Sequence, residues 1–132
     1  MKRWNTVGAL VVAIAVLSGC TSDDQSSAQQ SDPGSPMSVE ISIENFEFMP
    51  DEIEVPVGST ITWTNQDDFA HTVTSGEPAQ QTGRFDEELG SLGAHESSGK
   101  MASVTVDEPG AISYFCRFHP RMTATVVVTE ES

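Results

Sequence analysis

Basic residues are scarce in this chain, which carries 6 Lys and Arg against 20 Asp and Glu, for a formal net charge of −14. Nucleic-acid binding depends on basic surfaces that neutralise phosphates, so this composition argues against that function. It also argues against electrostatic attachment to anionic lipid. Two explanations fit the excess of acid: basic partner proteins or a high-salt habitat.

The chain also lacks a hydrophobic run long enough to span a bilayer comfortably. The apolar run at residues 7–17 follows Lys2 and Arg3, which is typical of a signal peptide. It ends in Leu17-Ser18-Gly19-Cys20, which resembles the bacterial lipobox, where cleavage precedes a cysteine that then carries lipid. We therefore predict a lipoprotein signal peptide over 1–19, a lipid anchor on Cys20, and an exported protein held on the periplasmic or extracellular face of the cell envelope. The alternative is an ordinary secretory signal that leaves Cys20 as a free thiol.

Cysteine is rare as well, with 2 residues in the chain. Two cysteines in an exported protein normally suggest a disulfide. Here Cys20 is the predicted lipidation site, which leaves Cys116 without a cysteine to pair with. A single thiol in an oxidising compartment needs a function, and metal ligation is one such function.

The residues after Cys20 contain almost nothing apolar up to Ser38. Such a segment cannot bury enough surface to offset the entropy lost on ordering, so residues 20–38 are predicted to be a disordered tether. Its 18 residues after the lipidated cysteine have a typical reach of roughly 24 Å. The folded domain is predicted over 39–132.

A helical period is absent from residues 39–132, and apolar residues alternate with polar ones instead. Short strands separated by turn residues predict an all-β sandwich of about seven or eight strands. A loop is expected at 75–83, and the pattern is weak over 84–100, with Phe85 and Leu89 as inward positions. The predicted strands are 39–49 (through the run NFEFMP), 53–57, 60–64, a short one from His71, 101–106, 111–116 and 123–129.

Unusual side chains gather in the segment YFCRFHPRM, where Cys116, His119 and Met122 lie three residues apart. Thiolate and thioether ligands select copper, and imidazole suits either copper oxidation state. Two histidines, one cysteine and a weak axial methionine are typical of blue-copper electron-transfer sites. The second histidine is His71, which opens a short strand upstream, whereas His95 is expected to be an ordinary surface or core residue. The sequence therefore predicts one copper ion.

Two stretches resemble the cupredoxins, the plastocyanin/azurin type of blue copper protein: FEFMPDEIEVPVGSTITWTNQDDFAHTV and DEPGAISYFCRFHPRM. The C-x2-H-x2-M spacing, with proline after the histidine, is most similar to that of amicyanins. The resemblance implies a Greek-key β-sandwich and a single copper ion. The copper ligands it implies are His71, Cys116, His119 and Met122.

The resemblance also implies roles around the metal. The downstream histidine of the family is the electron port at an apolar surface patch, a role that falls on His119 with Phe118 and Pro120. Where many relatives have an asparagine that ties the two ligand loops together, this chain has Thr72, whose hydroxyl has a shorter reach. Arg117 and Arg121 flank the port, and we expect them to raise the copper potential or to steer docking.

The leading functional hypothesis is a one-electron carrier between redox proteins, such as a cytochrome and a dehydrogenase or oxidase, with no small-molecule substrate. The alternative is a copper carrier that delivers metal to another protein without redox cycling. A copper enzyme such as an oxidase or a nitrite reductase is not expected, because it needs a second copper site. The chain has 3 histidines, and beyond His71 and His119 they cannot provide one.

Overall fold

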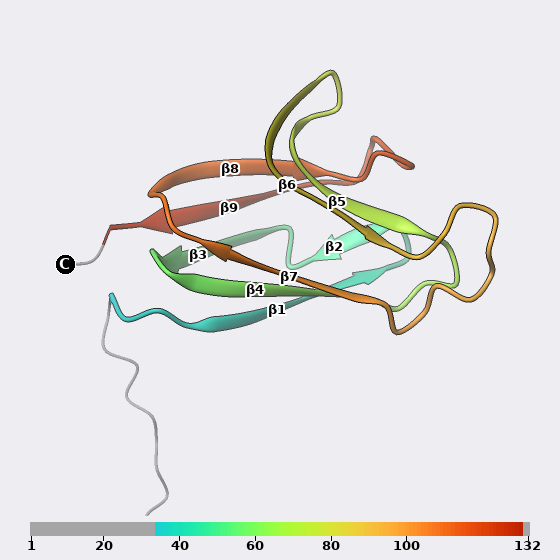
Figure 1. The fold of residues 1–132 in the computed structure, drawn as a ribbon, viewed down its shortest axis with the longest axis horizontal. Helices are drawn as coiled ribbons and strands as arrows, with labels where there is room; N and C mark the ends of the chain where they lie inside the picture. The colour runs from blue at the N-terminus through green and yellow to red at the C-terminus, as the bar shows by residue number, and fades with distance from the viewer. Residues whose placement is uncertain (1–33, 131–132) are drawn as a thin grey trace, which may run out of the picture.

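The computed structural model describes residues 34–130, an all-β domain of nine strands in two sheets (Figure 1). The predicted signal peptide, Cys20 and most of the predicted tether lie outside these residues. Within the described part no helix is long and apolar enough to cross a membrane. The strands are β1 (Ser38–Glu44), β2 (Glu47–Met49), β3 (Glu52–Pro56), β4 (Ser59–Asn65), β5 (His71–Glu77), β6 (Gln80–Leu89), β7 (Met101–Val106), β8 (Gly110–Phe115) and β9 (Thr123–Thr129).

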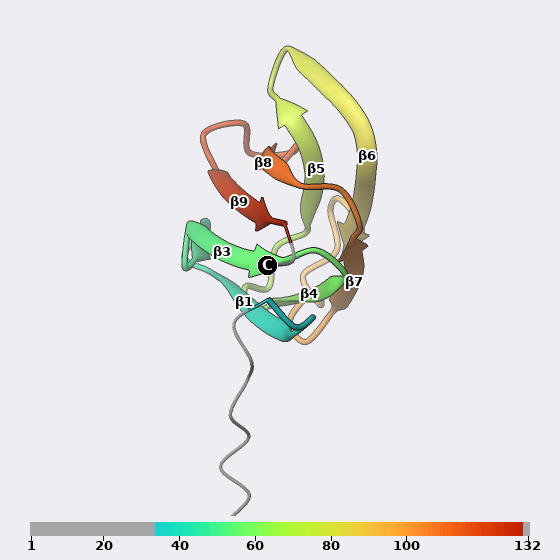
Figure 2. The same ribbon diagram turned by 90° about the vertical axis from the view of Figure 1, so that its left-hand side faces the viewer.

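The two sheets pack face to face as a sandwich (Figure 2). One sheet has the order β2-β1-β4-β7 and the other β3-β9-β8-β5-β6. The β1–β4 and β3–β9 pairs are parallel and the others antiparallel, so the chain passes repeatedly from one sheet to the other. The predicted Greek-key β-sandwich is confirmed, with nine strands in place of seven or eight.

The two ends of the sandwich differ in what they carry. β1 begins and β9 ends at one end, whereas the turn between β1 and β2 and the loop between β8 and β9 lie at the other (Figure 1). The loop between β8 and β9 belongs to the segment YFCRFHPRM, which carries three of the predicted metal ligands. The described chain therefore enters and leaves at the end opposite to the predicted metal ligands.

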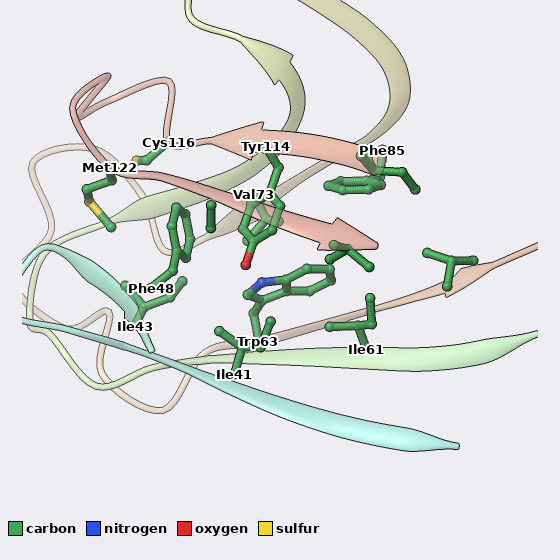
Figure 3. Close-up of a cluster of buried hydrophobic side chains, with 14 of the residues drawn as sticks. Ile41, Ile43, Phe48, Ile61, Trp63, Val73, Phe85, Tyr114, Cys116 and Met122 are labelled. Atoms are coloured by element: carbon green, nitrogen blue, oxygen red, sulfur yellow. The ribbon is translucent and has the colours of Figure 1, made fainter. Parts of the chain in front are cut away.

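Alternating side chains build the core between the sheets. In β4 every second residue is buried, including Ile61 and Trp63. The Trp63 ring lies 5.5 Å from that of Tyr114, and the Tyr114 hydroxyl points toward the indole nitrogen (Figure 3). Burial raises the pKa of Tyr114 to about 12. Cys116 and Met122 lie at one end of this core (Figure 3), so the predicted metal site is continuous with it.

The first correction concerns the run NFEFMP, which was predicted to continue the first strand. Instead the chain turns back at Asn45 and Phe46 into β2, which pairs antiparallel with β1. Both turn residues have positive φ, 54° and 63°, as a two-residue hairpin turn that matches the strand twist requires. The usual sequence signal for this turn is Asn-Gly, and phenylalanine at the second position hides it.

The second correction concerns residues 75–83, which were predicted to be a loop. They form the outer part of a long β5–β6 hairpin that extends beyond the sandwich (Figure 1). Most side chains of β6 are exposed, so no apolar alternation marks this strand in the sequence.

β1 begins at Ser38, one residue before the predicted domain boundary, and the Met37 N–H already donates to Ser59 Oγ at 3.0 Å.

Candidate metal centre

The candidate ligands come from two segments of the larger sheet. His71 is the first residue of β5, and the loop between β8 and β9 carries Cys116, His119 and Met122. That loop is closed by two backbone bonds, from the Cys116 N–H to the Met122 carbonyl at 3.1 Å and from the Met122 N–H to the His119 carbonyl at 2.9 Å. Pro120 fixes its own φ within this tight turn and so stiffens it.

Three ligand atoms form a compact triangle. Cys116 Sγ lies 3.8 Å from His71 Nδ1 and 3.6 Å from His119 Nδ1, and the two nitrogens are 3.2 Å apart. A point equidistant from all three lies about 2 Å from each, which is in the range of metal–nitrogen and metal–sulfur bonds. Within residues 34–130 it is the one group of three or more His, Cys, Asp or Glu side chains with such spacing. The donor set fits a soft transition-metal ion.

Burial of the four candidate residues is unequal. His71 and Cys116 are fully buried and Met122 is 4% exposed, whereas His119 is half-buried. Met122 lies at the same end of the core as Cys116 (Figure 3). Only the His119 imidazole therefore reaches toward the surface. His95 is exposed and packs its ring against Phe69.

Asp67 orients the His71 imidazole. His71 Nε2 lies 2.9 Å from Asp67 Oδ2, so the ring donates its Nε2–H and leaves the Nδ1 lone pair for a metal. Burial lowers the pKa of His71 more than Asp67 raises it, which keeps the imidazole neutral near pH 7. Burial alone would raise the pKa of Asp67, but the N–H groups of Phe46 and Asn45 and the His71 ring outweigh it and lower that pKa. Asp67 was not identified from the sequence, because it is one acid among 20 and only the fold of the β4–β5 loop brings it to His71.

An aromatic cluster covers the two histidines from the side of the β1–β2 turn. Asp67 accepts the N–H groups of both turn residues, at 2.8 and 3.0 Å, and so holds Phe46 in its left-handed conformation. The Phe46 ring meets His119 edge-on at 4.9 Å and His71 at 5.4 Å. Phe69 lies 5.4 Å from Phe46. The apolar patch around His119 thus includes two phenylalanines that the sequence reading missed.

Thr72 ties the two ligand segments together. Its N–H donates to Cys116 Sγ at 3.2 Å, and its hydroxyl accepts the Arg117 N–H at 2.7 Å. The Thr72 hydroxyl thus links the two ligand segments. It does so at the position where many members of the family that the sequence resembles are expected to use an asparagine side chain. The first bond is buried and the second is partly buried, and together they fix the thiol-bearing backbone against β5.

The two arginines on either side of His119 in the sequence, Arg117 and Arg121, differ in their surroundings. Arg117 Nε donates to Asp86 at 2.9 Å and its NH2 group donates to Glu88 at 2.9 Å. Both carboxylates raise the pKa of Arg117, Glu88 most. Its charge is therefore partly offset by the two carboxylates, whereas the expectation that the two arginines raise the copper potential or steer docking stays a prediction. Arg121 has no ion-pair partner within 4 Å among residues 34–130, and it lines a groove beside His119 together with Met49 and Pro120.

Comparison with known proteins gives a consistent match. The family described as copper binding proteins, plastocyanin/azurin family, matches residues 35–129. Amicyanin-alpha from Methylorubrum extorquens is 33% identical over 93 residues, which cover 69% of this chain and 71% of that protein. The purple cupredoxin from Nitrosopumilus maritimus superposes with a TM-score of 0.59 at 27% identity, covering 69% of this chain and 99% of that one.

A copper-containing nitrite reductase from Thermus scotoductus also superposes, with a TM-score of 0.57 at 25% identity. The match covers 75% of this chain and 24% of the reductase, so the two share one domain. The family match over most of the described domain agrees with the Cys-His-His cluster, the all-β sandwich and the predicted copper ion. The chain belongs to the plastocyanin/azurin family of copper-binding proteins, the cupredoxins.

Proposed function

We propose that this protein is a one-electron carrier with a mononuclear blue-copper centre, whose ligands are His71, Cys116, His119 and Met122. The observation that carries the proposal is the triangle of one thiol sulfur and two imidazole nitrogens with edges of 3.2 to 3.8 Å. A trigonal His, His, Cys set with a weak axial methionine is the ligand arrangement of blue-copper electron-transfer sites. Copper supplies the Cu(I)/Cu(II) couple when bound.

The surroundings of the ligands favour electron transfer. Asp67 fixes the His71 ring, Thr72 fixes the thiol, and two backbone bonds close the Cys116–Met122 loop. Ligands held by the rest of the protein change position little between two oxidation states, which keeps the reorganisation energy small. Two ligands are fully buried, which disfavours the alternative of a copper carrier, because handing over the metal requires ligands that a partner can reach.

The surface around His119 is suited to docking of a redox protein. His119 is half-buried, and the exposed large apolar side chains on its side of the domain include Phe46 at 41%, Phe69 at 46% and Met49 at 50%. Exposed apolar side chains that gather at one end of a monomer are typical of a protein interaction site. The proposed partners are redox proteins such as a cytochrome, a dehydrogenase or an oxidase, which exchange electrons through the His119 edge.

The proposed function is not enzymatic. Within residues 34–130 there is one cluster with metal-binding geometry, and the third histidine, His95, lies outside it. The nitrite reductase matches over a quarter of its length, so its remaining parts have no counterpart in the match. Among residues 34–130 no second group of His, Cys, Asp or Glu side chains has the spacing for another copper centre.

We further propose that the protein is exported and anchored to the cell envelope by lipid on Cys20. The support is the lipobox-like sequence Leu17-Ser18-Gly19-Cys20 at the end of a short apolar run. The described chain enters at the end of the sandwich opposite to the metal ligands (Figure 1). An anchor at the N-terminal side therefore leaves the His119 surface free to face a partner.

The test is a copper titration of the purified protein, followed by visible absorption and electron paramagnetic resonance. We expect an intense thiolate-to-copper band with narrow hyperfine splitting, lost in Cys116→Ser and His71→Ala. His95→Ala is the matched control and keeps the band, since His95 lies outside the cluster. A weak or absent band in the unaltered protein contradicts the electron-transfer proposal and favours a Cu(I) carrier.

A further inference from the structure

A closed ring of hydrogen bonds lies behind the loop that carries the thiol. The Arg117 N–H donates to Thr72 Oγ1 at 2.7 Å, and the Thr72 and Thr74 hydroxyl oxygens are 3.0 Å apart. Thr74 Oγ1 donates to Asp86 Oδ1 at 2.7 Å, and the same carboxylate oxygen accepts Arg117 Nε–H at 2.9 Å. The ring thus leaves Arg117 through its backbone and returns through its side chain.

The direction of every bond in this ring is fixed. A carboxylate oxygen can only accept, so the Thr74 hydroxyl must donate to Asp86. With that proton used, Thr74 can only accept from Thr72, whose hydroxyl in turn accepts the Arg117 N–H. Each hydroxyl therefore donates one bond and accepts one. A buried polar chain that is fully satisfied in this way rigidifies the segments that it joins.

Strand register explains why these residues meet. Thr72 pairs with Glu88, and Thr74 pairs with Asp86, across the β5–β6 ladder. Val73 belongs to the core between the sheets, so its neighbours on either side point to the other face of the sheet. Both threonines are nevertheless 0–1% exposed, so a lost hydrogen bond cannot be replaced by water without a structural change.

We propose that Thr74 and Asp86 are positioning residues that hold the Cys116–Arg117 backbone against β5 and thereby set the position of the thiol. The carboxylate polarises the two hydroxyls in series, which makes Thr72 Oγ1 a stronger acceptor for the Arg117 N–H. The backbone of Thr72 contacts Cys116 Sγ directly, so a shift of Thr72 moves the donor that faces the sulfur. The consequence for copper rests on the proposed function, whereas the ring itself does not.

Glu88 provides a matched control because it pairs with the same guanidinium but lies outside the ring. Asp86→Ala and Glu88→Ala each remove one exposed carboxylate beside Arg117. Thr74→Val removes the hydroxyl from the ring with little change in side-chain shape, whereas Thr74→Ser keeps it. If Asp86 acts only as a surface ion-pair partner of Arg117, then Asp86→Ala and Glu88→Ala have the same effect on exchange of the Arg117 amide. In that case Thr74→Val has no effect on this exchange.

The experiment measures amide hydrogen exchange in the purified metal-free protein by nuclear magnetic resonance. We expect exchange of the Arg117 amide to accelerate about tenfold in Thr74→Val and Asp86→Ala, because the loss of one hydrogen bond from the ring makes local opening about tenfold more frequent. Thr74→Ser and Glu88→Ala keep the original rate. The internal reference is the backbone amide of Asn65, the last residue of β4 in the other sheet, which donates to the Lys100 carbonyl. Its exchange rate stays unchanged in all four variants.

Two readouts at the thiol complete the test. In the metal-free protein, Thr74→Val and Asp86→Ala react faster than Glu88→Ala with a disulfide reagent at Cys116. In the copper-loaded protein the same two variants shift the hyperfine splitting and the thiolate-to-copper band. Equal Arg117 exchange in all variants overturns the proposal. Failure of the unaltered protein to form a blue site overturns the proposed function alone, because the exchange data still decide the role of the ring.

Discussion

One carboxylate, Asp67, serves two groups at the metal centre. It accepts the ring N–H of His71 and the backbone N–H groups of Asn45 and Phe46. The position of a proposed copper ligand and the position of the aromatic ring that covers His119 therefore depend on the same side chain. Buried Asn65 holds the loop that carries Asp67, because its side-chain NH2 group donates to the Phe69 carbonyl and its Oδ1 accepts the Asp67 N–H.

Replacing Asp67 with asparagine is expected to lower copper affinity 10- to 100-fold, the usual effect of losing an outer partner of a ligating histidine. An amide has one acceptor oxygen, so its NH2 group must face either the Asn45 N–H or the donors of Phe46 and His71, and the turn or the imidazole loses its partner. The measurement is a competition titration with a copper chelator. Asp68→Asn is the control, because it removes the same charge from an exposed neighbour. Equal affinities of the two variants contradict the prediction.

Replacing Met122 with leucine is expected to raise the reduction potential. Loss of the axial donor weakens Cu(II) more than Cu(I), and a tenfold difference between the two losses corresponds to about 59 mV. The potential is measured by voltammetry of the copper-loaded protein. Met101→Leu on exposed β7 is the control and leaves the potential unchanged. A lower potential in Met122→Leu means that Met122 is not the axial ligand.

The sequence predicts the candidate ligands but not the residues that hold them. Cys116, His119 and Met122 are donors with chemistry of their own, so their short spacing is visible without a fold. Asp67 and Asp86 are ordinary acids among 20, and their roles arise only where the β4–β5 loop and the β5–β6 register bring them to a ligand segment. The Phe46 cover depends on a turn whose sequence lacks the usual glycine.

At the scale of elements, the β5–β6 hairpin contains a bend that requires glycine. The pairing register shifts between Thr74 and Gly76, and Gly76 has φ of 112°. A Cβ atom at Gly76 would clash with the backbone of Gln80 and would lie 2.8 Å from Gln81 Cα. The bulge therefore sits directly after the threonines that hold the thiol segment.

Gly76→Ala is expected to destabilise the protein by about 2–5 kcal/mol, from backbone strain together with the clash. Gly83→Ala on the same hairpin is the control. Its φ is 72° and no heavy atom lies within 4 Å of the added Cβ, so only about 1–2 kcal/mol of conformational strain is expected. Urea denaturation of the metal-free proteins measures both values. A cost at Gly76 no greater than that at Gly83 contradicts the expected clash.

Strands with one face in the core are predictable from the sequence, and strands without such a face are not. β4 and β9 alternate buried and more exposed residues, β7 alternates exposed and partly or fully buried ones, and β8 is largely buried from its third residue on; each was predicted within a residue or two of its observed bounds. β6 buries two of its ten side chains, so periodicity has little to detect. β2 is three residues long, too short to show a period of its own.

At the scale of the whole molecule, negative charge is spread over the domain. If residues 1–19 are removed as predicted, 4 basic residues remain against 20 acidic ones, a formal net charge of −16. Exposed acids occur on β1, β3 and β6, that is, on both sheets. The groove beside His119 is also charged, because exposed Glu47, Asp51 and Arg121 line it together with apolar Met49. The negative charge is thus a property of the entire surface.

Self-repulsion of this kind destabilises the compact state, so added salt is expected to stabilise the protein. Raising sodium chloride from about 0.01 to 1 M shortens the Debye length from roughly 30 to 3 Å, which screens repulsion between acids on different strands. We expect the melting temperature of the metal-free protein to rise by a few degrees, on the order of 1 kcal/mol. Differential scanning calorimetry measures it.

The control separates screening from general salt effects on water. A variant with Glu40→Lys, Glu54→Lys and Glu87→Lys changes three exposed positions on three strands and makes the net charge less negative by 6. Its melting temperature should start higher at low salt and rise less with added salt, because there is less repulsion to screen. If the variant and the unaltered protein respond equally, the response comes from the solvent, and the acidic surface does not limit the stability of this fold.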